Sequence, residues 1–250
     1  MIERRFRPGL WASIASLTVF SILVGLGLWQ LQRLEWKQGL IDDLRARSEA
    51  PPLTEMPQPP LDLAALSYRN IRLTGRYLEG AEFLLPGRSY QGMTGEELAA
   101  AFVTQKGRGV IVSRGWLPPQ RVNSESRSAA QPEGPVTIEG ILRPGGWSGM
   151  ETFRPVNDPA QNRWFFYDLE TMTEIAGLED PETRLYVSLK RQPGDRSLPL
   201  PLPPAVTLAN NHLEYALTWF ALSGGLFGIY LLFGFARGRE TSGRETEERP

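Results

Sequence analysis

Two long stretches without charge are the strongest hydrophobic pattern in the chain, and they lie near its two ends. Residues 8–32 hold no charged side chain, and neither do residues 215–236. At about 1.5 Å of rise per helical residue, each stretch is long enough to cross the roughly 30 Å hydrocarbon core of a bilayer. The pattern therefore predicts two transmembrane helices, one near each end of the chain.

A cleaved signal peptide is the alternative interpretation of the first stretch. The apolar cores of signal peptides are about 7–15 residues long and end at a cleavage site with small residues. The stretch here is longer, it ends in Leu28–Gln32 without such a site, and Trp11 and Trp29 stand near its two ends as in an aromatic belt. These features favour a helix that is retained in the membrane.

The segments outside the two apolar stretches differ in their periodicity. Apolar residues recur at helical spacing among the charges of residues 33–50, and prolines dominate residues 51–61 and 196–211. The predicted organisation is an N-terminal segment 1–7, a transmembrane helix 8–32, an amphipathic helical extension 33–50, a proline-rich linker 51–61, a β-rich domain 62–195, a proline-rich tether 196–211, a second transmembrane helix 212–236 and a disordered tail 237–250.

The β-rich domain is predicted from short runs of alternating, β-branched and aromatic residues with Gly, Pro or Asn between them. Seven such runs are strand candidates: residues 69–77, 82–85, 101–104, 109–116, 136–142, 164–167 and 185–190. Their number and length favour an antiparallel barrel or a sandwich. One short helix is expected over Asp168–Ala176, with Asp168 as N-cap and Gly177 as the stop, and Glu96–Ala101 is a candidate second helical turn.

The arginines near the chain ends predict the orientation. Residues 197–214 contain no Lys or Arg, whereas Arg237 and Arg239 follow the second apolar stretch, and three arginines stand among the first seven residues. The positive-inside rule then places both termini in the cytoplasm and the β-rich domain in the periplasm. The predicted fold class is an α+β membrane protein, with two transmembrane helices flanking an extramembrane β-rich domain.

Composition excludes several classes of chemistry. A net charge of −1 provides no basic field for nucleic acid. The absence of cysteine rules out disulfides, thiolate metal sites and a cysteine nucleophile, and the single histidine rules out a multi-histidine metal site within one chain. Serine and carboxylate residues have no histidine base in the β-rich domain. We therefore expect a binding protein rather than an enzyme.

The one histidine, His212, stands where the chain enters the second apolar stretch. Helical spacing puts Tyr215 and Trp219 on the same face as His212. If the first helix packs alongside, its end brings Trp29, Gln30, Arg33 and Trp36 to the same depth. An imidazole, aromatic walls and a cation suit haem, whose iron takes an axial histidine and whose propionates pair with Arg.

Two features of the second stretch have simpler interpretations. His212 could be an interfacial polar residue at the helix start, with Asn210 or Asn211 as the N-cap. Gly224 and Gly228 form a small-xxx-small pair, suited to contact with the first helix or with a partner membrane protein. Both alternatives stay open on the sequence alone.

Several stretches resemble a known family. Residues 27–37, from Gly27 to Lys37, resemble the first-helix signature of the Surfeit locus protein family of cytochrome c oxidase assembly factors. Residues 68–77 and 114–118 are similar to its strand motifs, and residues 210–220 are similar to its second-helix signature. The order, the spacing and the two-helix architecture agree, so the resemblance covers nearly the whole chain.

The resemblance implies a non-enzymatic factor that helps build the haem–copper site of cytochrome c oxidase subunit I. Bacterial members of such a family are expected to hold haem a and to pass it from haem A synthase to the oxidase. The histidine of the second helix, implicated in haem binding, corresponds to His212. The pocket residues Trp29, Arg33, Tyr215 and Trp219 are our own inference. A haem-free scaffold for subunit I and an enzyme of haem A synthesis are the alternatives.

Overall fold

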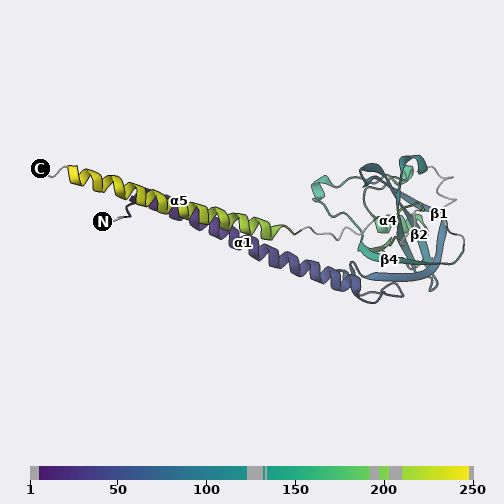
Figure 1. Ribbon diagram of the computed structural model, residues 1–250. Coiled ribbons are helices and arrows are strands. Elements are labelled where there is room, and N and C mark those ends of the chain that lie inside the picture. Colours follow the sequence, from purple (N-terminus) through teal and green to yellow (C-terminus); the bar gives the residue numbers. More distant parts are fainter. Residues whose placement is uncertain (1–5, 123–131, 133, 192–196, 203–209, 248–250) are drawn as a thin grey trace. The chain divides into compact units, whose positions relative to one another are not determined.

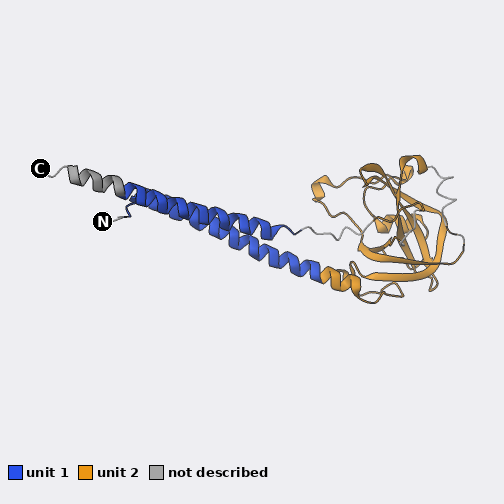
Figure 2. Cartoon of the chain, in the orientation of Figure 1, with its two compact units in different colours: residues 1–42, 208–250 blue, residues 43–207 orange. Residues whose placement is uncertain are grey.

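The computed structural model describes residues 6–122, 132, 134–191, 197–202 and 210–247. The chain divides into two compact units (Figure 2). The helical unit comprises residues 1–42 and 208–250, and the barrel unit comprises residues 43–207. Helix α1, Leu10–Glu49, begins in the helical unit and ends in the barrel unit, and helix α5, His212–Glu247, belongs to the helical unit.

Within the helical unit, α1 and α5 lie side by side and run antiparallel (Figure 1). Near the start of α1, the hydroxyl of Ser13 is 2.8 Å from that of Tyr230, late in α5. Further along α1, Gln30 contacts His212, the first residue of α5. A pair of contacts in this reversed order is possible only in an antiparallel hairpin.

The two outer ends of the hairpin meet. The backbone N–H of Arg7 donates to the carbonyl of Gly234 at 3.0 Å, and the guanidinium of Arg237 donates to the carbonyl of Pro8 at 3.4 Å. Arg7, which precedes α1, and Arg237, which follows the apolar part of α5, are therefore at the same end of the helical unit. This is the arrangement that two successive membrane spans require.

Both helices are long and apolar enough to cross a membrane, by length and composition. The candidate spans are Leu10–Glu49 and His212–Gly238, and only 6% and 11% of their most apolar windows are buried inside the protein. A core helix of a soluble protein would bury most of such a window, so the apolar side chains here point away from the protein.

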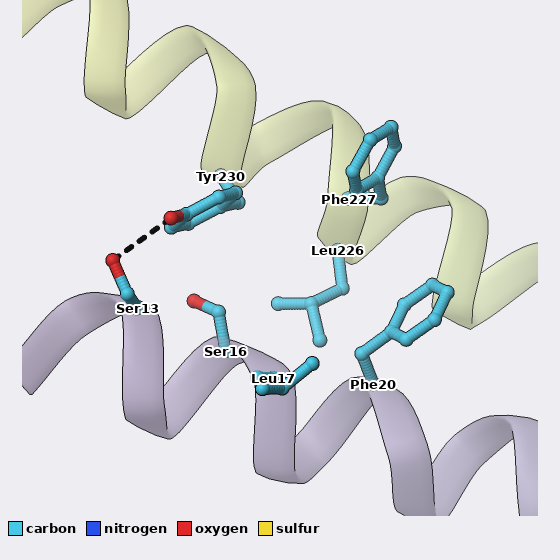
Figure 3. A pocket seen from close by; sticks show the side chains of 7 residues that line it. All are labelled: Ser13, Ser16, Leu17, Phe20, Leu226, Phe227 and Tyr230. Atoms are coloured by element: carbon cyan, nitrogen blue, oxygen red, sulfur yellow. Dashed lines mark hydrogen bonds between the residues drawn. The ribbon is translucent and has the colours of Figure 1, made fainter. Parts of the chain in front are cut away.

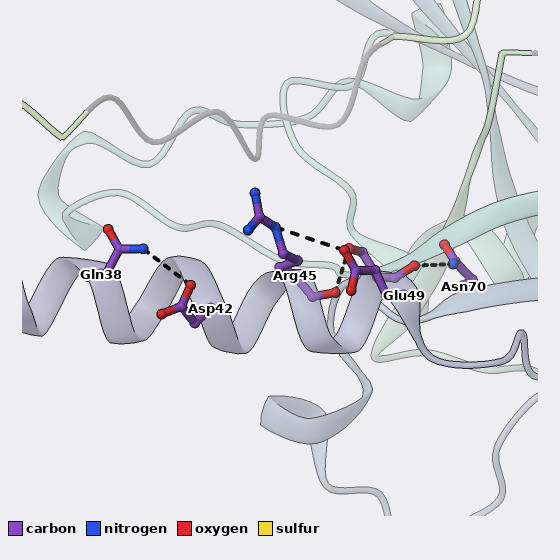
Figure 4. A network of polar contacts seen from close by, with 6 residues as sticks. Gln38, Asp42, Arg45, Glu49 and Asn70 are labelled. Atoms are coloured by element: carbon purple, nitrogen blue, oxygen red, sulfur yellow. Dashed lines mark hydrogen bonds and ion pairs between the residues drawn. The ribbon is translucent and has the colours of Figure 1, made fainter.

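Helix α1 is a single uninterrupted helix that includes the predicted extension 33–50. Its last turns belong to the barrel unit, where Leu44 is buried and Arg47 donates to the carbonyl of Ala64 at 2.6 Å. The carbonyl of Ser48 accepts from the Asn70 amide at 2.5 Å (Figure 4). The extension is therefore anchored to the sheet rather than free in solvent.

Five strands form one closed sheet: β1 Asn70–Tyr90, β2 Met93–Thr104, β3 Gly109–Leu117, β4 Val136–Pro144 and β5 Leu185–Leu189. Their order is β1-β2-β3-β5-β4, and β4 pairs back to β1, so the sheet closes into a barrel and not into the sandwich alternative. The β3–β5 pair is parallel, which corrects the prediction of a purely antiparallel sheet. Since β3 and β5 are far apart in sequence, no local turn signal could reveal their direction.

Four of the predicted elements differ in the structure. The runs 69–77 and 82–85 are parts of one long strand, β1, whose register shifts between Tyr77 and Glu82. The candidate helical turn Glu96–Ala101 is wrong, because these residues pair with β1 and β3 as part of β2. Residues 164–167 form only isolated bridges next to the sheet. Long-range pairing decides the extent of β1 and β2, whereas residues 164–167 lack, within the described residues, the strand partner that their local pattern would need.

Two hydrophobic cores flank the sheet, and β3 divides its side chains between them. Val110 and Val112 pack inside the barrel with Phe102 and other residues, whereas Ile111 points to the opposite face, against Trp164. This alternation follows from the two-residue period of a strand. Because both faces of the strand are covered, every residue of β3 is buried, including the polar Ser113 and Arg114.

Short helices complete the barrel unit: α2 Leu63–Leu66, η1 Pro119–Arg121, η2 Glu151–Phe153, η3 Pro159–Gln161 and α4 Leu169–Ile175. The prediction for α4 is confirmed. The Asp168 carboxylate caps the helix by accepting from the N–H of Thr171, and Gly177 follows with a φ of 61°. A left-handed residue just after a helix is the conformation that glycine adopts without strain.

The two proline-rich segments are extended but paired to the barrel. Leu53 forms a parallel bridge with Ile71, and Met56 is buried in the core. Leu200 exchanges two backbone hydrogen bonds with Trp116 of β3, at 2.7 and 2.8 Å. Each segment is thus partly docked rather than a free connector, while residues 192–196 and 203–209 of the tether region lie outside the described residues.

The predicted disordered tail begins as helix. Helix α5 continues to Glu247, although the sequence indicated disorder from residue 237. Arg and Glu are good helix formers, and adding a residue to an existing helix avoids the cost of nucleation. The apolar stretch supplies the nucleus from which the charged residues continue.

Candidate functional site

The site begins at the first turn of α5. The backbone N–H of Tyr215 donates to the carbonyl of Asn211 at 3.3 Å, so Asn211 occupies the N-cap position and His212 is the first helical residue. The amide nitrogen and oxygen of Asn210 are both buried without a hydrogen bond in the described structure. Of the two asparagines expected as caps, Asn211 is the one in place.

His212 contacts the first helix through one ring nitrogen. Its Nδ1 lies 2.7 Å from Oε1 of Gln30, and both side chains are half-buried. An amide oxygen has only lone pairs, so Nδ1 must carry the hydrogen for this contact to be a hydrogen bond. In the neutral ring, the lone pair is then on Nε2.

Close helix packing brings Gln30 to His212. A Cβ at Gly27, one turn before Gln30, would lie 2.5 Å from the ring of Phe220 on α5, well inside van der Waals contact. Ala216 and Ser223, on the same side of α5, are buried. A glycine on α1 therefore allows the approach that places the amide and the imidazole within hydrogen-bond distance.

The glycines singled out on α5 do not make this contact. A Cβ at Gly224, Gly225 or Gly228 would meet no atom within 4 Å. The expectation that Gly224 and Gly228 pack on the first helix is therefore wrong, and their face of α5 is open. Sequence spacing identified a small-residue pair but could not tell which face of the helix turns toward α1.

The predicted aromatic residues lie outward on the helix pair. Tyr215 is 57% exposed and Trp29 is 54% exposed, while Trp219 is half-buried. The guanidinium of Arg33 lies 3.8 Å above the ring of Trp36, in a cation–π contact on α1. The exposed rings of Tyr215 and Trp29 can contact a ligand that approaches from outside the helix pair.

The structure therefore joins His212 with Gln30, and Arg33 with Trp36. No hydrogen bond between His212 and Tyr215, Trp219 or Trp29 occurs in the described part of the chain. Gln30 was expected at the right depth but was not among the predicted site residues. An amide in an otherwise apolar helix, facing the one histidine of the partner helix, is the signal that identifies it.

The donor set fits a haem group bound through one axial ligand. One imidazole with its Nδ1 fixed, exposed aromatic rings and an arginine are the groups that haem proteins use for the iron, the macrocycle and the propionates. Among the described residues, no cluster of three or more His, Asp or Glu side chains could hold a metal ion on its own. Any metal at His212 would need ligands from another molecule.

A separate apolar cavity lies further along the hairpin (Figure 3). Its volume is about 270 Å³, and its lining comprises Ser13, Ser16, Leu17, Phe20, Leu226, Phe227 and Tyr230. The hydroxyls of Ser13 and Tyr230 are hydrogen-bonded to each other, and the rest of the lining is almost entirely hydrocarbon. This cavity offers space but few polar groups, and no pattern in the sequence predicted it.

The barrel unit contains a buried polar cluster around the carboxylate of Glu97. One carboxylate oxygen of Glu97 accepts from Ser113 at 2.5 Å and from Tyr167 at 2.6 Å, and the other lies 3.1 Å from Nε of Arg88. A second buried pair joins Arg108 to Glu182 at 2.9 Å. Because the hydroxyls of Ser113 and Tyr167 and the carboxylate of Glu97 satisfy one another, we interpret the cluster as structural.

Burial raises the pKa of three tyrosines of the barrel unit, Tyr77, Tyr167 and Tyr186, and so favours their neutral form. Burial raises the pKa of Tyr77 to about 12, against a weaker opposing effect of Arg114. Burial likewise raises the pKa of Tyr186 to about 12. Burial, followed by the charge of Glu97, raises the pKa of Tyr167 well above its usual value. The same desolvation lowers the pKa of the Arg114 guanidinium.

Comparison with known proteins identifies the family of the chain. The chain matches the SURF1 family over residues 17–224. It is 32% identical to Surfeit locus protein 1 of Homo sapiens, over 86% of this chain and 74% of the human protein. It is also 32% identical to Surfeit locus protein 1 of Takifugu rubripes, over 79% of this chain and 86% of that protein.

A bacterial relative aligns over more of the chain. The SURF1-like protein of Rickettsia bellii is 29% identical, over 93% of this chain and 96% of its own length. The chain belongs to the SURF1 family, and the resemblance drawn from residues 27–37 and 210–220 is confirmed. Family membership and two helices of this length and composition together support a membrane protein.

Proposed function

We propose that this chain is a non-enzymatic assembly factor for haem–copper cytochrome c oxidase, which holds haem a and passes it to oxidase subunit I. Membership of the SURF1 family supports the link to oxidase assembly. The contact between His212 and Gln30 carries the proposal for the site, because it prepares the only imidazole in the chain as a ligand.

His212 is the proposed axial ligand, and Gln30 sets its protonation. With Nδ1–H donated to Gln30, Nε2 keeps the lone pair that a ligand needs. Haem a supplies an iron that accepts such a nitrogen and propionates that pair with a cation. Arg33 is the cation proposed for this pairing, and Trp29, Tyr215 and Trp219 are proposed to cover the apolar macrocycle.

The proposed topology is a multi-pass protein of the inner membrane with both termini in the cytoplasm. Arg7 and Arg237 lie at one end of the helical unit, where the positive-inside rule favours the cytoplasmic side. The barrel unit is then periplasmic, and His212 stands near the periplasmic interface. The proposed partners are haem A synthase, which supplies the haem, and oxidase subunit I, which receives it.

The absorption spectrum of the purified protein tests the proposal. Full-length protein is produced in cells that make haem A, purified in detergent, and compared with His212→Ala. A haem a band close to stoichiometric in the parent and lost in His212→Ala is expected. No band in either protein contradicts haem custody and favours a scaffold that stabilises subunit I. Equal bands show that another residue is the ligand.

The absence of catalysis is tested separately. If the chain only carries haem, a deletion strain still makes haem A while its oxidase lacks the haem–copper site. A strain that loses haem A itself contradicts the proposal and indicates a step in haem A synthesis. Extraction and chromatography of total haem distinguish the two results.

A further inference from the structure

The loop between β4 and α4 exposes apolar side chains to solvent. Met150 is 70% exposed, Phe153 is 69% exposed and Val156 is 85% exposed. These three residues follow one another at intervals of three, and together with Phe165 they account for most of the large exposed hydrophobic side chains in the described barrel unit. Residues 150–156 are called the apolar loop below.

Hydrogen bonds and aromatic contacts on its protein-facing side hold the apolar loop in place. The Trp147 indole donates to the carbonyl of Met150 at 3.1 Å, and the N–H of Phe153 donates to the same carbonyl at 3.0 Å. The ring of Trp147 packs edge-on against the ring of Phe166. The guanidinium of Arg154 lies 4.9 Å from the centroid of the Phe166 ring. Other aromatic groups thus support the loop, while its own apolar side chains point away from the protein. Ordered exposure of this kind marks an interaction surface.

The charges of the apolar loop are balanced within it. Arg154 donates to the carboxylate of Glu151 at 3.0 Å. The loop consequently presents hydrocarbon without a net charge, and a strongly charged partner would gain little from it. A neutral apolar surface instead suits an uncharged, apolar environment.

The size of the loop argues for lipid rather than for a protein partner. A stable protein interface buries about 800 Å² on each side and involves some 20–30 residues, which a loop of seven residues does not provide by itself. A bilayer makes no such demand. The barrel unit is preceded and followed in the chain by helices apolar enough to cross a membrane, so a bilayer would be present at high effective concentration.

We propose that the apolar loop inserts into the interfacial region of the lipid bilayer, with Phe153 and Val156 as its deepest side chains. Insertion buries their exposed hydrocarbon at the boundary of headgroups and acyl chains, typically about 5–10 Å deep. The contact would fix the distance and tilt of the barrel unit above the membrane. The inference rests on membrane attachment, which belongs to the proposed function, and it is independent of haem binding.

Spin labels measure this insertion directly, since the chain has no cysteine of its own. Phe153→Cys and Val156→Cys are labelled with a nitroxide in the full-length protein, which is reconstituted into vesicles of zwitterionic lipid alone. Glu79→Cys, at an exposed position of β1, is the matched control. Relaxation by oxygen, which concentrates in lipid, is compared with relaxation by a water-soluble nickel chelate.

We expect the labels at 153 and 156 to show a several-fold higher ratio of oxygen to nickel accessibility than the label at 79. Equal ratios at all three positions would overturn the proposal. So would protection at 153 and 156 that appears only after oxidase subunit I is added, because the loop would then be a protein-docking surface. Unchanged circular dichroism of each variant controls for folding. Loss of the haem band with intact insertion would separate a failure of the haem proposal from a failure of this one.

Discussion

The barrel unit and the helical unit arrange their polar side chains in opposite ways. In the barrel unit, Glu97 is buried and its carboxylate is surrounded by Ser113, Tyr167 and Arg88. In the helical unit, His212 is only half-buried and uses one nitrogen, toward Gln30. Groups that satisfy one another hold a fold together, whereas a group with unused bonding capacity at a half-open position can bind a ligand.

This difference in the pairing of polar side chains indicates the candidate binding site more clearly than the composition of the two units does. The barrel unit holds most of the charged and hydroxyl side chains, yet its buried ones are engaged with each other. The helical unit is poor in polar groups, and the few that lie between its helices meet in pairs, such as Ser13 with Tyr230. Of these pairs, only His212 with Gln30 leaves a strong metal ligand available.

The largest expected effect is on the barrel unit. Glu97→Ala removes the acceptor of the buried cluster and leaves the buried hydroxyls of Ser113 and Tyr167 without a partner, at a typical cost of about 1–3 kcal/mol each. The midpoint of chemical denaturation, followed by near-ultraviolet circular dichroism of the full-length protein, should fall accordingly. Glu79→Ala, at an exposed position, is the control. A Glu97→Ala protein as stable as the parent would show that the cluster does not stabilise the fold.

Alkaline pH should destabilise the same unit. Tyr77 and Tyr186 ionise near pH 12 in the folded protein but near pH 10 when unfolded, so the folded state retains more protons in between. Stability is complete below about pH 10 and falls by about 1.4 kcal/mol per pH unit for each tyrosine as the pH rises toward 12. Denaturation midpoints between pH 9 and 12 measure this. Tyr77→Phe should flatten the dependence, and an unchanged slope would contradict the assignment.

In the helical unit, Gln30→Leu should weaken the proposed haem site without unfolding the protein. Loss of a residue that orients a metal ligand typically lowers affinity about 10–100-fold. Retention of the haem a band during dialysis measures this, with Gln32→Leu as control because Gln32 is exposed on the same helix.

Because the chain has one histidine, ¹⁵N-histidine NMR of the haem-free protein reports its tautomer directly. Hydrogen on Nε2 instead of Nδ1 in the parent would refute the role of Gln30.

The smallest expected effect is on the stability of the helical unit, and it distinguishes the closely packed Gly27 from the open Gly224. Gly27→Ala forces Phe220 away from α1 and should loosen the hairpin by about 1–3 kcal/mol, the usual cost of overpacking. Gly224→Ala meets open space and should change stability by about 1 kcal/mol or less. Thermal unfolding in detergent, together with the His212 tautomer, measures both. Equal effects would mean that the close approach at Gly27 does not position His212.

Local patterns predicted the elements that depend on neighbouring residues. The charge-free stretches correspond to α1 and α5, and Asp168 caps α4 as its position before the helix indicated. The motif residues at 27–37 and 210–220 were sufficient to indicate the family. Each of these signals is contained in a short span of chain, where periodicity and capping act directly.

Elements defined by distant partners were not predictable in this way. Glu96–Ala101 has the composition of a helical turn, but pairing on both sides places it in β2. The parallel contact of β3 with β5 joins residues more than seventy positions apart, as in the register of Val112 with Val187. Long-range pairing outweighs local propensity because it buries side chains on both faces of the sheet.

The sequence by itself determined that one apolar helix precedes and another follows a β-rich region in the chain. It also indicated the family and supplied a single histidine. The tertiary structure alone decided that Gly27 rather than Gly224 forms the helix contact, and that Gln30 meets His212. The physical reason is geometric. Spacing along a helix specifies which residues share a face, but the packing of the two helices selects which faces meet and which polar groups become partners.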